Sequence, residues 1–249
     1  MWKSIKISCF LVGTYKIVDF SHQLYQGLDN YYLSKVPDLA QTFGGYALIT
    51  SSETPLAQSY ATFLAQNKIN LIFLSPDGTI DSQLHSNLQK NSIDIKTIKF
   101  DGANSETKLD YNNLLEQLSK YDISLLINAI DNEPEPIDFE RNSLLSIKKT
   151  IIGNILPPTV LMSNFIGIFE KRTKRSAIVN VGSQTGECLA PFQSVYAGTK
   201  SFLNYLSKGV AYEVGEKVGM VLVTPPKGLG KEEREEVVVN SFKNIEGKK

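Results

Sequence analysis

The sequence predicts an α/β fold built on a single Rossmann-like, doubly wound parallel sheet. Short apolar segments of strand length recur along the chain and alternate with stretches of helical periodicity. A strand, helix, strand order implies right-handed crossovers between parallel strands. The length of 249 residues suits one such domain. The predicted strands are residues 46–50, 70–75, 93–100, 123–130, 177–181 and 219–224.

Composition narrows the possible partners and ligands. The chain carries 26 Lys and Arg against 26 Asp and Glu, so no overall field favours nucleic acid, and we expect no nucleic-acid partner. The two cysteines, Cys9 and Cys188, are too far apart in the sequence to suggest a disulfide framework. Neither His22 nor His85 has a Cys or His neighbour at ligand spacing, which predicts that the protein binds no metal.

The sequence divides into an apolar arm and connector at 1–45, the Rossmann domain at 46–230, and a charged C-terminal tail at 231–249, which we expect to form one terminal helix with a frayed end. Charged residues interrupt the first 25 residues, so they lack the 18 or more uncharged residues of a spanning helix, and they lack a secretory cleavage site. Aromatic residues with flanking lysines suit a helix at a membrane interface or in a partner's groove. Packing on the chain's own domain is the alternative. The aromatic residues are Trp2, Phe10, Tyr15 and Phe20.

The stretch from Ser183 to Lys200 carries the chemistry. It follows the apolar segment 177–181 and leads into a helix on which Tyr196 and Lys200 share one face. An ammonium beside a phenol favours the phenolate, which suits the tyrosine for proton transfer to a carbonyl oxygen. Ser183, at the end of the preceding strand, could steady the same oxygen. The alternative is a half-buried core tyrosine and a solvated lysine.

This Ser…Tyr-x-x-x-Lys arrangement resembles the short-chain dehydrogenase/reductase family. Residues 43–50, 71–75 and 122–128 are similar to its 17β-hydroxysteroid dehydrogenase and 3-ketoacyl-CoA reductase branch, which includes inactive hydroxysteroid dehydrogenase-like proteins of mitochondria. The resemblance implies a catalytic tetrad of Asn154, Ser183, Tyr196 and Lys200, in which Asn154 holds a water that relays protons to Lys200. The alternative role for Asn154 is that of a polar residue near Pro157 and Pro158.

The resemblance also implies a dinucleotide site, and here the sequence departs from the family. Asp101 matches the adenine-contacting residue and Asn128 the asparagine of the fourth strand. The glycine-rich loop is replaced by Thr50 to Ala57, in which Ser51, Pro55 and Ala57 stand where the family has glycines. Pro55 also removes a helix N–H that would face the diphosphate, and Glu53 adds negative charge beside it. Pro225 begins the closing motif, which lacks the threonine that would meet the nicotinamide amide.

These departures lead us to expect no cofactor, or weak NADP(H) binding. The function that follows is a degenerate short-chain dehydrogenase acting as an accessory subunit of a larger, membrane-associated assembly, with other protein subunits as partners. By analogy with the branch, we expect a mitochondrial location, with the endoplasmic reticulum membrane as the alternative. The alternative function is an active NADP(H)-dependent reductase of 3-ketoacyl or steroid-type carbonyls. The chain ends soon after the closing motif, which leaves little sequence for substrate-covering helices.

Overall fold

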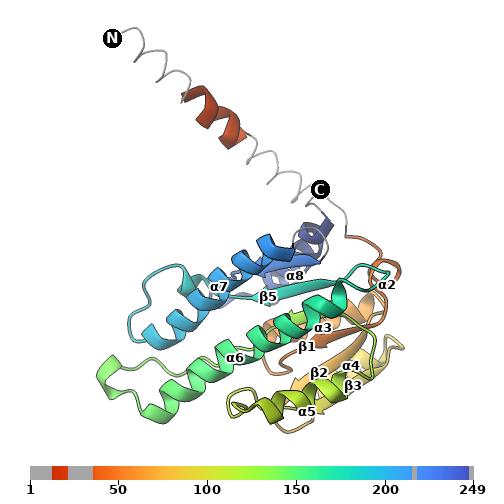
Figure 1. The fold of residues 1–249 in the computed structure, drawn as a ribbon, viewed down its shortest axis with the longest axis horizontal. Coiled ribbons are helices and arrows are strands. Elements are labelled where there is room, and N and C mark those ends of the chain that lie inside the picture. Colours follow the sequence, from red (N-terminus) through yellow and green to blue (C-terminus); the bar gives the residue numbers. More distant parts are fainter. Residues whose placement is uncertain (1–12, 22–35, 215–217, 247–249) are drawn as a thin grey trace.

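A six-stranded, all-parallel sheet forms the centre of the computed structural model, which describes residues 13–21, 36–214 and 218–246. The strand order is β3-β2-β1-β4-β5-β6, so the order reverses between β1 and β4 (Figure 1). This confirms the predicted doubly wound sheet. The strands are β1 (Tyr46–Ile49), β2 (Asn70–Ser75), β3 (Ile95–Lys99), β4 (Ile123–Asn128), β5 (Ala177–Val181) and β6 (Gly219–Val223).

Helices cover both faces of the sheet and divide the core into two clusters. One cluster joins the sheet to α3, α4 and α8, and the other joins it to α5, α6 and α7. The inner strands are apolar over their whole length because both faces are covered, as β4 shows with every residue buried. The helices are α2 (Leu39–Thr42), α3 (Pro55–Gln66), α4 (Ser82–Gln89), α5 (Lys108–Leu118), α6 (Leu144–Phe169), α7 (Ser194–Val214) and α8 (Lys231–Glu246).

The C-terminal segment forms the charged helix expected from the sequence. Residues 231–246 make up α8, which packs against β6 and α3. Val238, Phe242 and Ile245 are buried on its inner face. The Phe242 ring stacks on Phe63 of α3 at a centroid distance of 5.4 Å. The charges lie on the outer face, so α8 is an amphipathic core helix of the domain.

The amino-terminal end of the sheet is closed by backbone contacts that admit little variation. Gly45 has a φ of +64°, and a Cβ there would lie 2.2 Å from the carbonyl oxygen of Asp122, so only glycine fits. Arg172, after α6, donates to the carbonyl oxygens of Ile123 and Phe43 and pairs with the Asp122 carboxylate at 3.1 Å. These contacts fix the connector to the sheet before β1 begins.

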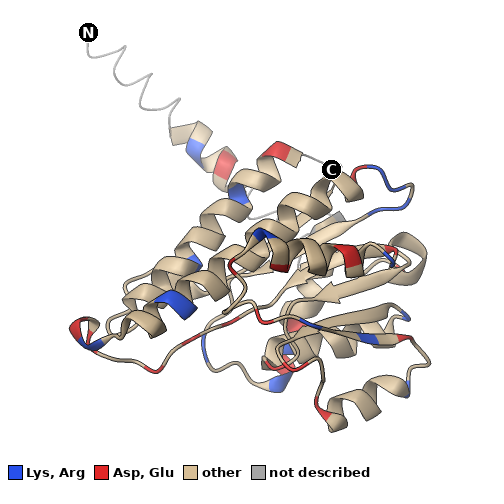
Figure 2. Cartoon of the chain, turned by 60° about the horizontal axis from the view of Figure 1, so that its bottom comes forward, with Lys and Arg blue, Asp and Glu red and all other residues tan. Residues whose placement is uncertain are grey.

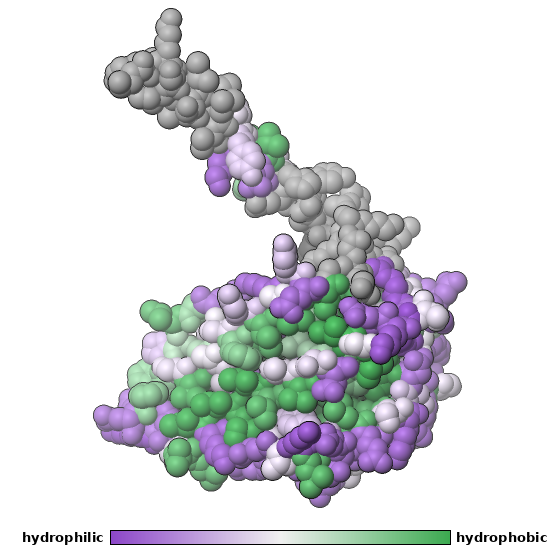
Figure 3. Space-filling model, in the orientation of Figure 1, coloured by the Kyte–Doolittle hydropathy of each residue, from purple (hydrophilic) through white to green (hydrophobic). Residues whose placement is uncertain are grey.

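The helix α6 is long and apolar enough to cross a membrane by length and composition, and no other helix among the described residues is. Its inner face nevertheless packs on the sheet through Leu161, Met162, Phe165 and Phe169, as a core helix does. Its outer face and that of α7 expose apolar side chains, and Figure 3 shows the green surface over this side of the molecule. Large exposed members include Leu144, Leu145 and Ile168 of α6 and Phe202, Tyr205 and Tyr212 of α7.

Most of the apolar arm predicted at 1–25 lies outside the described residues. Residues 13–21 are described and helical. Tyr15, Ile17, Val18 and Phe20 on this helix are each 67% or 68% exposed. This part of the arm therefore presents apolar side chains outward.

Candidate functional site

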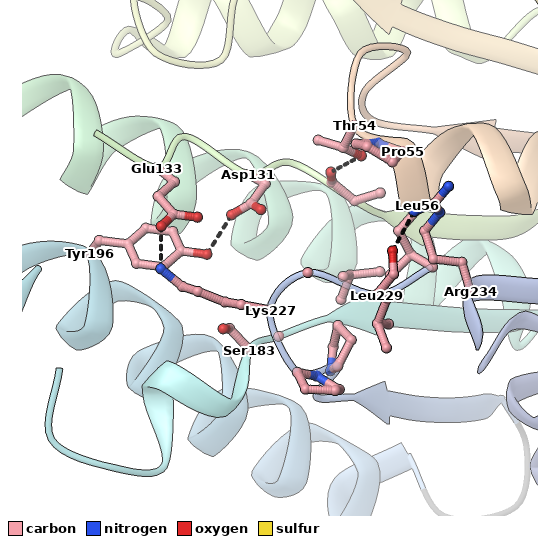
Figure 4. A pocket seen from close by; sticks show the side chains of 16 residues that line it. Thr54, Pro55, Leu56, Asp131, Glu133, Ser183, Tyr196, Lys227, Leu229 and Arg234 are labelled. Carbon is pink, nitrogen blue, oxygen red and sulfur yellow. Dashed lines mark hydrogen bonds and ion pairs between the residues drawn. The ribbon is translucent and has the colours of Figure 1, made fainter. Parts of the chain in front are cut away.

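The site lies at the carboxyl ends of the strands, where the strand order reverses between β1 and β4. Ligands bind in α/β sheets at this kind of reversal point. Two pockets adjoin each other there, one of about 350 Å³ and one of about 80 Å³. The larger is bordered by α7 and by the segment after β6, and the smaller lies under the loop after β1 (Figure 4 shows the larger). Thr54 and Asp131 line both pockets.

Tyr196 and Lys200 lie one turn apart on α7 and are almost completely buried, with 2% and 1% of their surface exposed. The Lys200 ammonium lies 5.6 Å from the centre of the Tyr196 ring. It donates to the carbonyl oxygens of Ile130, at 3.2 Å, and Val181, at 3.5 Å. The predicted shared face of this helix is thus confirmed, and the lysine is a core residue rather than a solvated one.

Asp131, which the sequence analysis did not single out, joins these two side chains. The Tyr196 hydroxyl donates to Asp131 Oδ1 at 2.7 Å, and Lys200 Nζ lies 3.1 Å from the same oxygen. Asp131 is the third residue after β4, in a connection to α6 that carries several acidic residues (Figure 2). Because Asp131 and Tyr196 are 65 positions apart, sequence spacing does not indicate this contact. The available signal was that β4 ends at the same sheet edge as β5, which leads to Ser183.

The electrostatic state of Tyr196 is opposite to the expected one. We expected Lys200 to favour the phenolate, but the pKa of Tyr196 is raised above its ordinary value. Burial is the largest cause, and the charge of Asp131 and its hydrogen bond to the hydroxyl add to it. Glu133 contributes further in the same direction. Tyr196 is therefore a neutral phenol, and its O–H donates to an internal carboxylate.

Asn154 contacts the backbone of the segment that carries Asp131. Its Oδ1 accepts from the N–H of Asn132 at 2.9 Å, and its Nδ2 donates to the carbonyl oxygen of the same residue at 3.0 Å. The neighbouring Gly153 permits this approach, because a Cβ there would lie 2.0 Å from Asn132 Nδ2. The oxygen and the nitrogen of the Asn154 side-chain amide are thus both bonded to the backbone of Asn132. Asn154 therefore fixes Asn132 in place.

Ser183 lies at the end of β5 and faces the larger pocket beside Tyr196 (Figure 4). Its hydroxyl is 2.7 Å from that of Thr185 and accepts from the Thr185 N–H at 3.2 Å. The structure therefore places Ser183 and Tyr196 on one pocket, as predicted, whereas Lys200 is buried behind the tyrosine and Asn154 bonds to the neighbouring segment.

Charged and polar side chains close the outer edge of the larger pocket. Lys227, after β6, forms an ion pair with Glu133, and its ammonium lies 5.7 Å from the centre of the Tyr196 ring. Gln193, just before α7, donates to the same carboxylate. These contacts link the connection after β4, the connection after β6 and the start of α7 around Tyr196 (Figure 4).

The loop from Thr50 to Pro55 is stabilised by its own bonds. Thr50 Oγ1 accepts from the N–H of Ala129, which ties the ends of β1 and β4. Thr54 caps α3 by accepting from the N–H of Ala57 at 3.2 Å, and Pro55 occupies the first turn without an N–H. Ser51 accepts from the N–H of Glu53. No residue from 50 to 55 has a positive φ, so the turn has the ordinary geometry of L-residues.

These residues do not fit the diphosphate of a dinucleotide. Of the first three positions of α3, only Leu56 has an N–H to offer, because Pro55 has none and that of Ala57 is bonded to Thr54. Glu53, Asp101 and Asp131 line the smaller pocket, so carboxylates surround the space that two phosphates would need. A helix N-terminus binds phosphate through free N–H groups and positive potential, and both are diminished here.

The other predicted cofactor residues, Asp101, Asn128 and Pro225, differ in whether they line a pocket. Asp101 accepts from the N–H of Ala103 and the amide of Asn104 and so stabilises its own turn at the smaller pocket. Asn128 is buried within the sheet, where its amide donates to Asn180 at 2.7 Å, and it lines neither pocket. Pro225 lines the larger pocket. Among the described residues, no three His, Cys, Asp or Glu side chains are grouped as a metal site requires.

Comparison with known proteins identifies the family. The profile of the short chain dehydrogenases matches residues 45–229, which is most of the chain and includes the whole sheet. The chain belongs to the short-chain dehydrogenase family. The match covers both the divergent loop after β1 and the Ser183, Tyr196 and Lys200 cluster.

Curated relatives of this short-chain dehydrogenase include proteins named as reductases and one named as inactive. A very-long-chain 3-oxoacyl-CoA reductase of Coccidioides immitis is 27% identical over 174 residues, covering 69% of this chain and 49% of the relative. An inactive hydroxysteroid dehydrogenase-like protein 1 of Danio rerio is 23% identical over 218 residues, covering 84% and 66%. The corresponding reductase of Caenorhabditis elegans is 28% identical and is also covered to 66%. The chain thus spans about two thirds or less of the length of these relatives.

Solved structures agree on the fold of this short-chain dehydrogenase. A ketone-specific alcohol dehydrogenase from Comamonas testosteroni superposes with a TM-score of 0.73 at 24% identity, covering 81% of this chain and 84% of that one. A short-chain dehydrogenase from Sphingobium yanoikuyae superposes with a TM-score of 0.66 at 21% identity, covering 78% and 81%. At this level of identity the likeness establishes the architecture alone.

Proposed function

We propose that this short-chain dehydrogenase is an accessory subunit of a larger, membrane-associated assembly and does not reduce carbonyls with NAD(P)H. The observation that carries the proposal is the loop at the start of α3. Pro55 and the Thr54 cap remove two of the three N–H groups that would face a diphosphate, and Glu53 adds a negative charge beside them. Without a bound hydride donor, Tyr196 has no reduction to complete.

The exposed apolar surface supports the accessory role. The described part of the arm presents Tyr15, Ile17, Val18 and Phe20 outward, and α6 and α7 add a second apolar surface on the domain. Contiguous exposed apolar surface is typical of sites that bind proteins or membranes. We propose a mitochondrial membrane as the location, supported by the aromatic, lysine-flanked sequence of residues 1–25, with the endoplasmic reticulum membrane as the alternative.

Titration with NADPH tests the first half of the proposal. Purified full-length protein is titrated while the nicotinamide fluorescence is recorded, and we expect no saturation below about 1 mM. Saturable binding at micromolar concentration would overturn the proposal. The triple variant Ser51→Gly, Glu53→Gly, Pro55→Gly is the matched gain-of-function arm, and stronger binding by this variant would assign the defect to the loop.

Substitution on the arm tests the second half. The double variant Ile17→Glu, Phe20→Glu places charges on side chains that are 67% exposed, so the domain should fold unchanged. We expect the variant to be lost from the membrane fraction, or from the large complex seen on native gels, when it replaces the wild-type chain in cells. Leu109→Glu, which alters a 66% exposed residue of α5 outside both apolar surfaces, is the control and should behave as wild type. Equal distribution of wild type and the arm variant would contradict an arm-mediated assembly.

The second candidate function is an NADP(H)-dependent reductase of 3-ketoacyl or steroid-type carbonyls. The observation in its favour is that Ser183 and Tyr196 line a pocket of about 350 Å³, with Lys200 behind the tyrosine. Relatives named very-long-chain 3-oxoacyl-CoA reductases agree with this possibility. NADPH consumption with a 3-ketoacyl-CoA would decide for the reductase.

A further inference from the structure

The Tyr196 hydroxyl and the Lys200 ammonium converge on a single oxygen of Asp131, at 2.7 and 3.1 Å. Both donors are buried, whereas the Asp131 side chain is 36% exposed and lines both pockets. A phenol O–H and an ammonium that meet at one point form a receptor for a carboxylate oxygen, because both interactions with a charged acceptor are strong.

We propose that Tyr196 and Lys200 form a carboxylate-binding site that the chain fills itself with Asp131, so that Asp131 is an internal inhibitor of the Tyr–Lys pair. The inference concerns the occupancy of the pair and stands apart from the accessory role proposed above. A ligand oxygen reaches the Tyr196 hydroxyl only when the Asp131 carboxylate has left it.

Two backbone anchors, in addition to the side-chain contacts, hold the carboxylate in this position. Lys200 donates to the carbonyl oxygen of Ile130 on one side of Asp131. Asn154 holds the N–H and carbonyl oxygen of Asn132 on the other side. The aspartate is therefore fixed through the backbone on both sides as well as through its side chain. The two tetrad residues thus contribute directly to keeping the site closed.

Electrostatics favours this internal occupant. An ammonium buried to 1% exposure needs a counter-charge, because an unpaired buried charge is strongly disfavoured. Glu133, the next carboxylate along the segment, is already paired with Lys227. Asp131 thus supplies the negative charge that Lys200 requires, and its loss would leave a cationic, hydrogen-bond-donating cavity between the two pockets. A small carboxylate such as formate fits the chemistry of that cavity.

Tyrosine NMR on the full-length protein tests this inference directly. The protein is labelled with ¹³C at tyrosine Cζ, and Tyr196→Phe identifies the Tyr196 signal. In wild type we expect this signal to stay that of the neutral phenol up to about pH 11. In Asp131→Ala the titration midpoint should fall by about one pH unit or more, because Lys200 then acts on Tyr196 unopposed. Added formate should move the midpoint back toward the wild-type position.

Two further variants make the outcome specific. Asp131→Asn keeps an acceptor in place without the charge, so its midpoint should fall but should not respond to formate. It also serves if Asp131→Ala does not fold. Asp101→Ala removes a carboxylate that lines the smaller pocket and bonds its own turn, and it should leave the Tyr196 signal unchanged.

An unchanged Tyr196 midpoint in both Asp131 variants would overturn the inference. A midpoint that falls in Asp131→Ala but ignores formate would also overturn it, because the pair would then not be a carboxylate site. This experiment does not measure dinucleotide binding. A negative result would therefore overturn the carboxylate-site inference and leave the proposed accessory role unaffected.

Discussion

The two halves of the site have diverged in different ways. In the loop half, Thr50 to Ala57, the N–H groups at the start of α3 are missing at Pro55 and engaged by Thr54 at Ala57. In the tetrad half, Asn154, Ser183, Tyr196 and Lys200 are all present. The structure nevertheless engages three of these four with the segment from Ile130 to Asn132.

This difference shows that side chains of the types found in a catalytic tetrad can have a structural role. Tyr196 and Lys200 hold Asp131, and Asn154 holds Asn132, so these side chains stabilise the connection after β4. In the loop half, in contrast, the side chains form local caps and turns. Stability should therefore depend strongly on the tetrad half and weakly on the loop half.

Lys200→Met should give the largest effect. The variant loses the ion pair with Asp131 and the hydrogen bonds to Ile130 and Val181. We expect the free energy of unfolding to fall by about 2–3 kcal/mol, somewhat less than for a fully buried pair because Asp131 is partly exposed. Urea unfolding followed by circular dichroism measures it. Lys208→Met, on the exposed side of the same helix, should stay within about 0.5 kcal/mol of wild type. If the two variants are equally stable, the tetrad half is not structural.

Asn154→Ala should have the next largest effect. The N–H and carbonyl groups of Asn132 lose their partners, which costs about 1–3 kcal/mol when such groups remain out of water. Hydrogen exchange of the Asn132 amide should accelerate at the same time. Asn164→Ala, which removes an exposed asparagine bonded within α6, is the matched control. Slow exchange at Asn132 in Asn154→Ala would contradict the role of Asn154 as an anchor.

Glu53→Gln and Pro55→Ala should change stability little. Glu53 is exposed, and Pro55 occupies a first-turn position that most residues accept. We expect a loss of at most about 1 kcal/mol for Pro55→Ala, through the greater freedom of the unfolded chain, and less for Glu53→Gln. The same urea titrations apply. A cost for either variant as large as that of Lys200→Met would remove the contrast between the two halves.

The smallest loss of stability should follow from removing a second tyrosine–aspartate contact, which lies at the opposite end of the sheet. Tyr46 donates to Asp94 at 2.7 Å in a partly exposed position. This hydrogen bond is the main cause of two shifts: it raises the pKa of Tyr46 to about 12 and lowers the pKa of Asp94. A lowered carboxyl pKa stabilises the fold above the unfolded pKa of about 3.9 and is lost as the pH falls through the folded value.

Asp94→Asn should therefore be slightly less stable than wild type at neutral pH, and the difference should vanish in acid. Thermal unfolding across this pH range is the measurement. A difference between the two proteins that persists in acid would show that the contact acts through packing and not through charge.

The fold could be predicted from the sequence because the patterns that indicate its strands and helix starts each lie within a short segment. The six strands were placed by apolar segments, and the first turn of α3 by Pro55. The sequence patterns did not indicate α4 and α5, whose apolar faces are short. In the site, helical spacing brought Tyr196 and Lys200 together correctly. Asp131 and the bonds of Asn154 could not be predicted, because they join residues 65 and 22 positions apart through the path of a loop.

The position of α8 determines when the core can be completed during synthesis on the ribosome. Phe242 packs on Tyr60 and Phe63, so one of the two core clusters is completed by residues translated after all six strands. Domains fold as they emerge from the ribosome, at about 5–20 residues per second. A nascent chain that has reached only the end of β6 exposes the aromatic side of α3. Chaperone binding should therefore be strongest in this interval and end when α8 docks.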